Sequence, residues 1–307
     1  MNKKLVTTSL AVALGLGSFG AVSANFSPIK ASAATTNVQN NQLAAEQKAD
    51  DIIRFAKSLI GKATYGTNNE DALRFQCASF MEYIFRSNGV HLGSKFEDYM
   101  VKQGEYVSKS QLQKGDLVFF RSPGNVNPTH VAMYIGNNKV IHAANAKLDI
   151  VISDLNSTDY YKGNYMTARR VLPSLLPSNP PTKADNIVED AYDLMDEVTM
   201  GRVNDEDEMK FSGGGYVNYI YKINGINLGE TSVTKLSKLG KTVSRDNLKK
   251  GDLIFINSTI GSSTPTRVAI YAGEHRIIVP SSEGISDRVL LSDYYDSHYM
   301  YAKRVIQ

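Results

Sequence analysis

Apolar residues recur at intervals of three and four in two segments of the first half of the chain, which is the spacing of an amphipathic helix. The first segment covers residues 44–60, and the second begins at Cys77 and ends at the helix-stopping pair Asn88-Gly89. The apolar positions are Ile52, Ile53, Ala56, Leu59 and Ile60 in the first segment, and Phe80, Met81, Ile84 and Phe85 in the second. The pattern therefore predicts that Cys77 lies at or near the N-terminus of a helix.

Beyond these helices the pattern changes to short runs of β-branched and aromatic residues separated by Gly, Asn and Pro. The runs cover residues 117–120, 131–135, 140–142 and 168–172. Runs of this length between turn residues are typical of an antiparallel sheet. Because the helices come first and the strands follow, the sequence predicts an α+β fold and not an alternating α/β fold.

The second half of the chain repeats the first. The segment Lys114 to Phe119 returns as Lys250 to Phe255, and the segment Val131 to Gly136 returns as Val268 to Gly273. A proline-rich stretch at 173–182 separates the copies and is expected to be an extended linker. We therefore predict two homologous domains, at residues 45–172 and 183–307.

The first residues resemble an export signal. Two lysines precede an apolar run, and the small residues Ala31-Ser32-Ala33 follow it. This pattern predicts a signal peptide at residues 1–33, although cleavage after Ala24 is a second possibility. Residues 34–44 are polar and are expected to form a tether. We expect an exported protein with no membrane segment after cleavage.

Composition narrows the functional classes. The 307 residues are 42% hydrophobic with a formal net charge of +3, and no basic run with interleaved aromatics suggests nucleic-acid binding. The sequence also contains no clustered ligand set for a metal ion. Its one cysteine, Cys77, cannot form an internal disulfide, so it is a buried inert residue, an intermolecular link or a reactive thiol. The start of a helix favours the thiolate and predicts a lowered pKa for Cys77.

Two histidines lie in neighbouring predicted strands of the same domain. His130 opens the strand 130–135 and His142 lies in the next one, with the turn Gly136-Asn137-Asn138 between them. Opposite residues of paired strands share a face, so a turn with an odd number of residues places both histidines on one face. A cysteine nucleophile needs a base and a group that orients the base, and these two histidines can supply both.

The second domain provides an internal comparison. Gly213 stands where the first domain has Cys77, Arg267 replaces His130, and Val279 replaces His142. Framework residues persist while all three candidate chemical groups are missing together. We infer that Cys77, His130 and His142 form one functional unit, and that the second domain is a degenerate copy.

These motifs resemble the NlpC/p60 family of papain-like cell-wall cysteine peptidases. The similar features are the cysteine at a helix start, Lys-Gly-Asp-Leu-Val-Phe-Phe, His-Val-Ala-Met-Tyr-Ile-Gly and Val-Ile-His-Ala. The resemblance implies that Cys77 is the nucleophile, His130 its base and His142 the residue that orients the base. It also implies a pocket lined by Tyr65, a position that Met200 occupies in the second domain. No cofactor is implied.

By the same resemblance, the partner is peptidoglycan and the bond is an amide of its stem peptide, with the D-glutamate to diamino acid bond as first choice. The family usually has Asp-Cys-Ser-Gly-Phe, whereas this chain has Gln76-Cys77-Ala78-Ser79-Phe80. We expect Gln76 and Ser79 to contribute to substrate binding, with altered preference. Two alternatives are open: a non-catalytic protein that binds cell wall, and an amidase or acyl transferase with the same Cys and His pair. The second domain is either a binding module or a structural partner of the first.

Overall fold

The computed structural model describes residues 29–306, so most of the expected signal peptide lies outside the described residues. Helix α1 (Ile29–Ser58) runs through residues 34–44, which we expected to form a tether, and continues into the predicted amphipathic helix. Its buried face includes Ala49, Ile52 and Ala56, and it contacts α2 (Cys77–Arg86) and α5 (Leu172–Leu175). Within residues 29–306, no helix is both long and apolar enough to cross a membrane.

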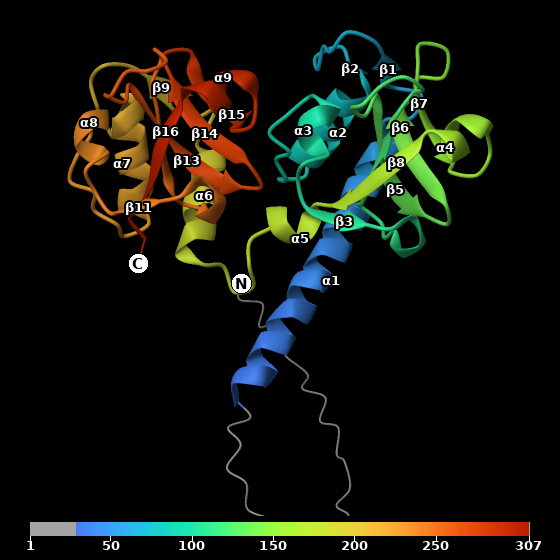
Figure 1. Ribbon diagram of the computed structural model, residues 1–307, viewed down its shortest axis with the longest axis horizontal. Helices are drawn as coiled ribbons and strands as arrows, with labels where there is room; N and C mark the ends of the chain where they lie inside the picture. Colours follow the sequence, from blue (N-terminus) through green and yellow to red (C-terminus); the bar gives the residue numbers. More distant parts are fainter. Residues whose placement is uncertain (1–28, 307) are drawn as a thin grey trace, which may run out of the picture.

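The first domain is built on a six-stranded antiparallel sheet, as the sequence predicted (Figure 1). Helix α2 packs against β5 and β6 and closes one face of the core. The strand order is β3-β8-β4-β5-β6-β7. Their bounds are β3 (Glu105–Val107), β4 (Leu117–Phe120), β5 (His130–Gly136), β6 (Lys139–Ala143), β7 (Ile150–Asp154) and β8 (Tyr165–Arg170). The smaller elements are β1 (Thr64–Tyr65), β2 (Arg74–Phe75), α3 (Glu97–Met100), η1 (Lys109–Gln111) and α4 (Asp159–Gly163).

The turn between β5 and β6 differs in detail from the expected three-residue loop. Gly136 pairs with Lys139, so the loop holds only Asn137 and Asn138, both with positive φ. A register shift between Tyr134 and Gly136 supplies the extra residue as a bulge. Because one inserted residue has the same effect on side-chain parity as an odd-length loop, both histidines still face the same side of the sheet.

The second domain has the same element order and the same strand order, which confirms the tandem arrangement. Its sheet runs β11-β16-β12-β13-β14-β15 and is antiparallel throughout. The strands are β11 (Lys241–Val243), β12 (Leu253–Ile256), β13 (Arg267–Gly273), β14 (Arg276–Ser281), β15 (Gly284–Val289) and β16 (Tyr299–Arg304), beside the short pair β9 (Thr199–Met200) and β10 (Lys210–Phe211). The helices are α6 (Lys183–Asp193), α7 (Gly213–Ile223), α8 (Val233–Leu236), η2 (Arg245–Asn247) and α9 (Asp293–His298).

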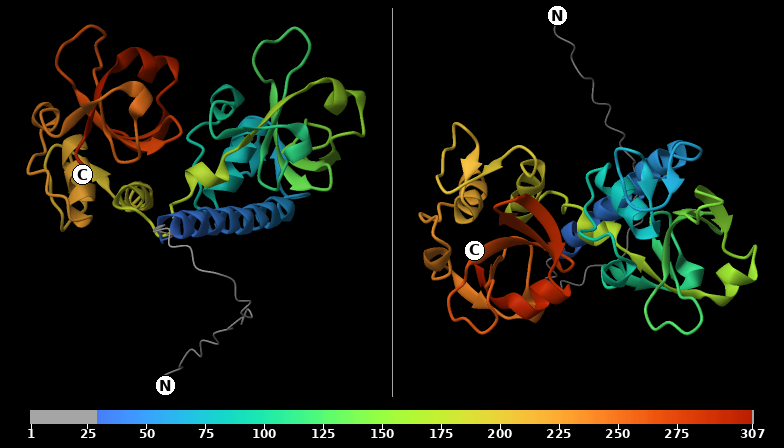
Figure 2. Two further views of the ribbon diagram at one scale, coloured as in Figure 1. Left: turned by 60° about the horizontal axis from the view of Figure 1, so that its bottom comes forward. Right: turned by 90° about the horizontal axis from the view of Figure 1, so that it is seen from above.

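The two domains lie side by side (Figures 1 and 2), and a few hydrogen bonds and one ring stack join them. The buried Arg276 guanidinium donates to the His91 carbonyl oxygen at 2.7 Å, and the His91 ring stacks on Tyr192 with centroids 3.8 Å apart. The Gly104 N–H donates to the Glu274 carboxylate at 2.7 Å. His91 is therefore largely covered by the second domain.

Candidate active site

Cys77 is the first residue of α2, as predicted, and only 8% of it is exposed. The helix start is held by Ser79, whose hydroxyl accepts from the Gln76 N–H at 2.9 Å and donates to the Gln76 carbonyl at 3.0 Å. Ser79 is buried while Gln76 is exposed beside the thiol. The structure thus gives Ser79 a capping role, which fixes the backbone around the sulfur.

The two histidines are in direct contact. Nε2 of His130 lies 2.7 Å from Nδ1 of His142. Beyond them, Nε2 of His142 lies 3.0 Å from the Ser153 hydroxyl and 3.2 Å from the Tyr161 hydroxyl, and Tyr161 donates to Ser153 at 3.0 Å. A chain of hydrogen bonds therefore extends from His130 on β5, through His142 on β6, to β7 and α4.

These hydrogen bonds determine which ring nitrogens of His130 and His142 carry a proton when His130 acts as a base. Tyr161 donates to Ser153, so both oxygens can accept from Nε2–H of His142. Nδ1 of His142 then accepts from Nε2–H of His130. The remaining nitrogen of His130, Nδ1, carries a lone pair and has no hydrogen-bond partner among the described residues. It is the position at which a thiol proton can be accepted.

The protonation of the pair differs from the expectation for a cysteine at a helix start. Burial, and next the carboxylate of Glu97 at 4.0 Å from the sulfur, raise the pKa of Cys77 to about 11. Backbone N–H groups of Val131, Ala78 and Cys77 act in the opposite direction but are outweighed. The prediction of a lowered pKa is therefore wrong, because desolvation and a like charge exceed the helix-dipole effect.

Burial also lowers the pKa of His130 to about 4. Burial, and next the charge of His130, lower that of His142 to about 3. Near neutral pH the thiol of Cys77 and the imidazoles of His130 and His142 are thus all neutral in the free protein. An arrangement of this kind transfers the proton during attack on a substrate and does not start from an ion pair.

Two tyrosines lie within electrostatic reach of the sulfur. Burial raises the pKa of Tyr65, and the charges of Cys77 and Glu97 add to this, which places all three around one site. The Tyr65 N–H donates to the Asp149 carboxylate at 2.9 Å, so its strand is fixed to the loop after β6. Burial likewise raises the pKa of Tyr160, with smaller contributions from groups that include Cys77.

The sequence singled out Cys77, His130, His142 and Tyr65, but it did not predict roles for Glu97, Ser153 or Tyr161. A tyrosine recurs at the matching position of the second domain, Tyr295, so the repeat gives no sign of a role for Tyr161 that is specific to the first domain. Comparison of the two repeats could have singled out Ser153, because this residue, like the histidines, is not kept in the second domain. In the pairing of β6 with β7, Ser153 is opposite Val140, and the matching position in the second domain is Arg288, opposite Ile277.

The second domain places no cysteine or histidine at the equivalent positions. Helix α7 begins at Gly213 as α2 begins at Cys77, and Arg267 opens β13 as His130 opens β5. Val279 on β14 lies opposite Ser286, as His142 lies opposite Val151. Met200 ends β9 where Tyr65 ends β1.

Among the described residues, one group of side chains has metal-ligating atoms within 4.8 Å of one another: Glu82, His91 and Asp287. It lies in the domain interface, away from the thiol. Arg276 donates to the hydroxyl of Tyr192, which in turn donates to Asp287, so a cation already stands beside these carboxylates. We interpret the group as part of the interface.

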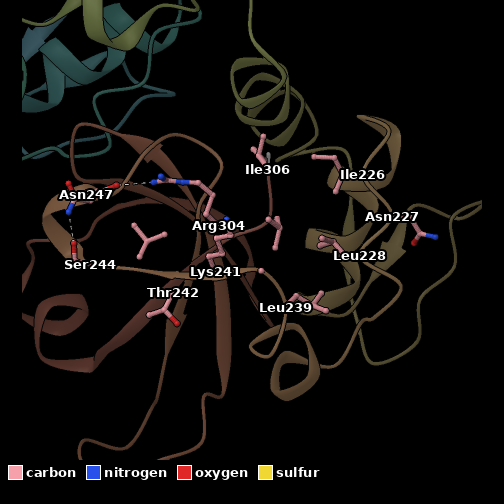
Figure 3. Close-up of a pocket in the computed structure, with 13 residues that line it drawn as sticks. Ile226, Asn227, Leu228, Leu239, Lys241, Thr242, Ser244, Asn247, Arg304 and Ile306 are labelled. Carbon is pink, nitrogen blue, oxygen red and sulfur yellow. Dashed lines mark hydrogen bonds between the residues drawn. The ribbon is translucent and has the colours of Figure 1, made fainter.

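The largest of the described pockets, about 1140 Å³, lies in the second domain and is also remote from the thiol. Figure 3 shows Arg304 and Lys241 at this pocket, with Arg304 hydrogen-bonded to the Asn247 carbonyl. Asn227 and Gly240, which line it, match His91 and Gly104 of the first domain by the repeat. The pocket therefore lies on the face of the second domain that corresponds to the interface face of the first domain.

Comparison with known proteins now adds to this geometry. The family model described as "NlpC/P60 family" matches residues 62–170 and 201–304, which together are more than half of the chain. The chain belongs to the NlpC/P60 family. Both repeats are matched, so the family assignment holds for each domain, and the relatives include a murein DD-endopeptidase of Escherichia coli (strain K12).

Two curated relatives are informative for this NlpC/P60 protein. A gamma-DL-glutamyl hydrolase of Bacillus subtilis (strain 168) is 28% identical over 260 residues, which cover 82% of this chain and 60% of the relative. A gamma-D-glutamyl-L-lysine dipeptidyl-peptidase of Bacillus cereus is 36% identical over 126 residues, covering 41% of this chain and 37% of the relative. The chain thus spans less than two thirds of either relative.

Among solved structures, an NlpC/P60 family protein from Bacillus cereus is 36% identical. The match covers 41% of this chain and 40% of that one, with a TM-score of 0.37.

Proposed function

We propose that this protein is a cysteine peptidase that hydrolyses an amide bond in peptidoglycan stem peptides. The observation that supports it most is the 2.7 Å contact between His130 and His142 in the domain whose core helix begins at Cys77. Nucleophilic catalysis by cysteine requires a thiol and a base whose tautomer is fixed by a further group, and the contact with His142 can fix the tautomer of His130. The family membership is in agreement with it.

The proposed reaction starts from the neutral pair. Nδ1 of His130 takes the thiol proton while the Cys77 sulfur attacks the scissile carbonyl carbon. Backbone N–H groups at the start of α2 stabilise the oxyanion of the tetrahedral intermediate. The intermediate collapses to a thioester when His130 returns its proton to the leaving amine. Water, deprotonated by His130, then hydrolyses the thioester and restores the thiol.

We propose a γ-glutamyl amide as the bond, with the D-glutamate to diamino acid linkage as first choice. Two relatives carry names that specify gamma-glutamyl bonds. Gln76 is exposed beside the sulfur and can hydrogen-bond substrate, whereas Ala78 offers no hydroxyl. Tyr65 would form one wall of this site. We also propose that residues 1–33 direct export, so that the enzyme meets its substrate at the cell wall.

A second candidate function is wall binding without catalysis. It is favoured by one observation, namely that burial and Glu97 raise the pKa of Cys77 to about 11 and so reduce the thiolate population. In that case both domains would bind wall peptides and neither would cleave them. An amidase or acyl transferase that uses Cys77 and His130 on another amide or ester is the third candidate.

Mass spectrometry of defined muropeptides tests these candidates. We expect the wild-type chain to release new fragments whose masses identify the γ-glutamyl bond, and Cys77→Ala to release none. Intact muropeptides with wild-type protein at every pH, together with cosedimentation with purified wall, would reject the peptidase in favour of the binding protein. Fragments that persist in Cys77→Ala would reject the role of the thiol.

A further inference from the structure

The second domain has an open cleft at the position that corresponds to the active site. Its volume is about 440 Å³, and its lining includes Met200, Ser212, Gly213, Arg267 and Pro280. Three of these are the residues that stand at the places of Tyr65, Cys77 and His130. The substrate-binding region of the repeat is therefore hollow in the copy that has no thiol.

The glycine run at the start of α7 shows which residue keeps this cleft open. A Cβ at Gly214 would overlap the carbonyl oxygen of Thr231, and one at Gly215 would overlap the side chain of Asn204, so close packing explains both. A Cβ at Gly213 would have Pro280 as its nearest neighbour at 3.7 Å, an ordinary contact. A side chain would thus fit at Gly213, and its absence widens the cleft.

The charge of the lining has one sign. Among the described residues that line the cleft, Arg202 and Arg267 are basic and none is acidic. Neither guanidinium forms a hydrogen bond or ion pair with another described residue. By contrast, Arg304, at the end of β16, pairs with Asp252. Arg267 is half-buried, so its charge is only partly solvated. Such guanidinium groups bind carboxylates well, in a bidentate way.

We infer that this cleft binds the free α-carboxylate of a γ-linked glutamyl peptide. The inference rests on the proposed function, since a γ-glutamyl bond uses the side-chain carboxyl of glutamate and leaves its α-carboxylate free. Arg267, in the place of the catalytic base, forms the main contact, and Arg202 at the rim adds a second positive charge. The N-terminal end of α7 opens into the same cleft and favours an anion there. The second domain then holds part of a substrate that the first domain cleaves.

The full chain carrying Cys77→Ala, which binds without turnover, is the material for the test. Calorimetric titration with γ-D-glutamyl-L-lysine is expected to show two sites per chain. Arg267→Gln in that background should weaken one site by about tenfold or more, because a charge-assisted bidentate contact is lost. Arg202→Gln should weaken the same site less. Lys241→Gln, which removes an exposed charge at the other pocket, is the matched control and should leave both sites intact.

Two further probes identify what the cleft recognises. The same dipeptide with its glutamyl α-carboxylate converted to an amide should lose the Arg267-dependent site only. Oligomers of γ-linked glutamate distinguish a glutamate polymer from a stem peptide as the source of the carboxylate, since only the polymer lacks a diamino acid. Whichever probe binds the Arg267-dependent site more tightly identifies the source.

Equal binding by Arg267→Gln and its parent, with unchanged circular dichroism, would overturn the inference, as would equal binding of the amide. Its failure is separable from that of the proposed function. Hydrolysis by the wild-type chain with Arg267-independent binding would reject the second site alone. Arg267-dependent binding with no hydrolysis would reject the peptidase and leave the carboxylate site standing.

Discussion

At the scale of single residues, the protonation of Cys77 depends on a competition between burial and the helix start. Three backbone N–H groups favour the thiolate, but desolvation and the Glu97 carboxylate outweigh them. Only the helix position can be read from the sequence near Cys77. Glu97 is twenty positions away in the sequence and is the first residue of α3. It lies near the sulfur only because the tertiary fold brings α3 to the start of α2.

Glu97→Gln should therefore make Cys77 more reactive. Removing the carboxylate lowers the pKa of the thiol, and we expect alkylation by iodoacetamide at pH 8 to be about threefold to tenfold faster. The measurement is the pH dependence of the alkylation rate, followed by intact-protein mass spectrometry. Asp98→Asn removes the same charge one residue further along and should change the rate much less. Equal rates for Glu97→Gln and wild type from pH 7 to 10 would contradict this account.

At the scale of elements, the candidate active site is assembled from β5, β6, β7, α2 and α4. The sequence predicted the helix that begins at Cys77 and the two histidine strands, because each has a strong local pattern. It predicted the shared face of His130 and His142 correctly although the turn was described wrongly, since a bulge and an odd loop have the same parity. Ser153 and Tyr161 were missed because polar residues on an outer strand and a short helix have no pattern that links them to His142.

Ser153 and Tyr161 contact His142, so on the proposed mechanism they are positioning residues whose removal should affect the tautomer of the proposed base, His130. We expect Ser153→Ala combined with Tyr161→Phe to lower kcat about tenfold, because His142 loses both acceptors for Nε2–H. KM should stay close to the wild-type value, since neither group is proposed to touch substrate. Ser157→Ala, an exposed serine of the same region, is the control. A rise in KM alone would instead indicate a substrate contact.

At the scale of the whole molecule, the interface between the domains contains buried carboxyl groups. Burial, and next the charge of Asp287, raise the pKa of Glu82 to about 8. Burial raises that of Asp287 to about 6 although the adjacent Arg276 lowers it. Glu82 Oε2 accepts from the Leu92 N–H at 3.1 Å, which fixes the carboxyl against the segment that reaches the second domain.

Raised carboxyl pKa values make the folded chain less stable as pH rises. Between the usual value near 4.5 and about 8, folded Glu82 holds a proton that the unfolded chain has released. The free energy of unfolding then falls by up to about 1.4 kcal/mol per pH unit for this one group. Glu82→Gln, which keeps an acceptor for Leu92 N–H, should flatten this slope in urea titrations at pH 5 to 8. An unchanged slope would mean that Glu82 is ionised in the folded protein.

The position of Glu82 on α2 has a mechanical consequence. The ten residues of this helix carry Cys77, the proposed nucleophile, at one end and, further along, a carboxyl group that belongs to the contact with the second domain. An α-helix of this length moves largely as one unit, so the position of Cys77 is coupled to the position of Glu82 and thus to the second domain. The second domain can thus influence turnover without contacting a reacting atom, because it restrains the helix that carries Cys77.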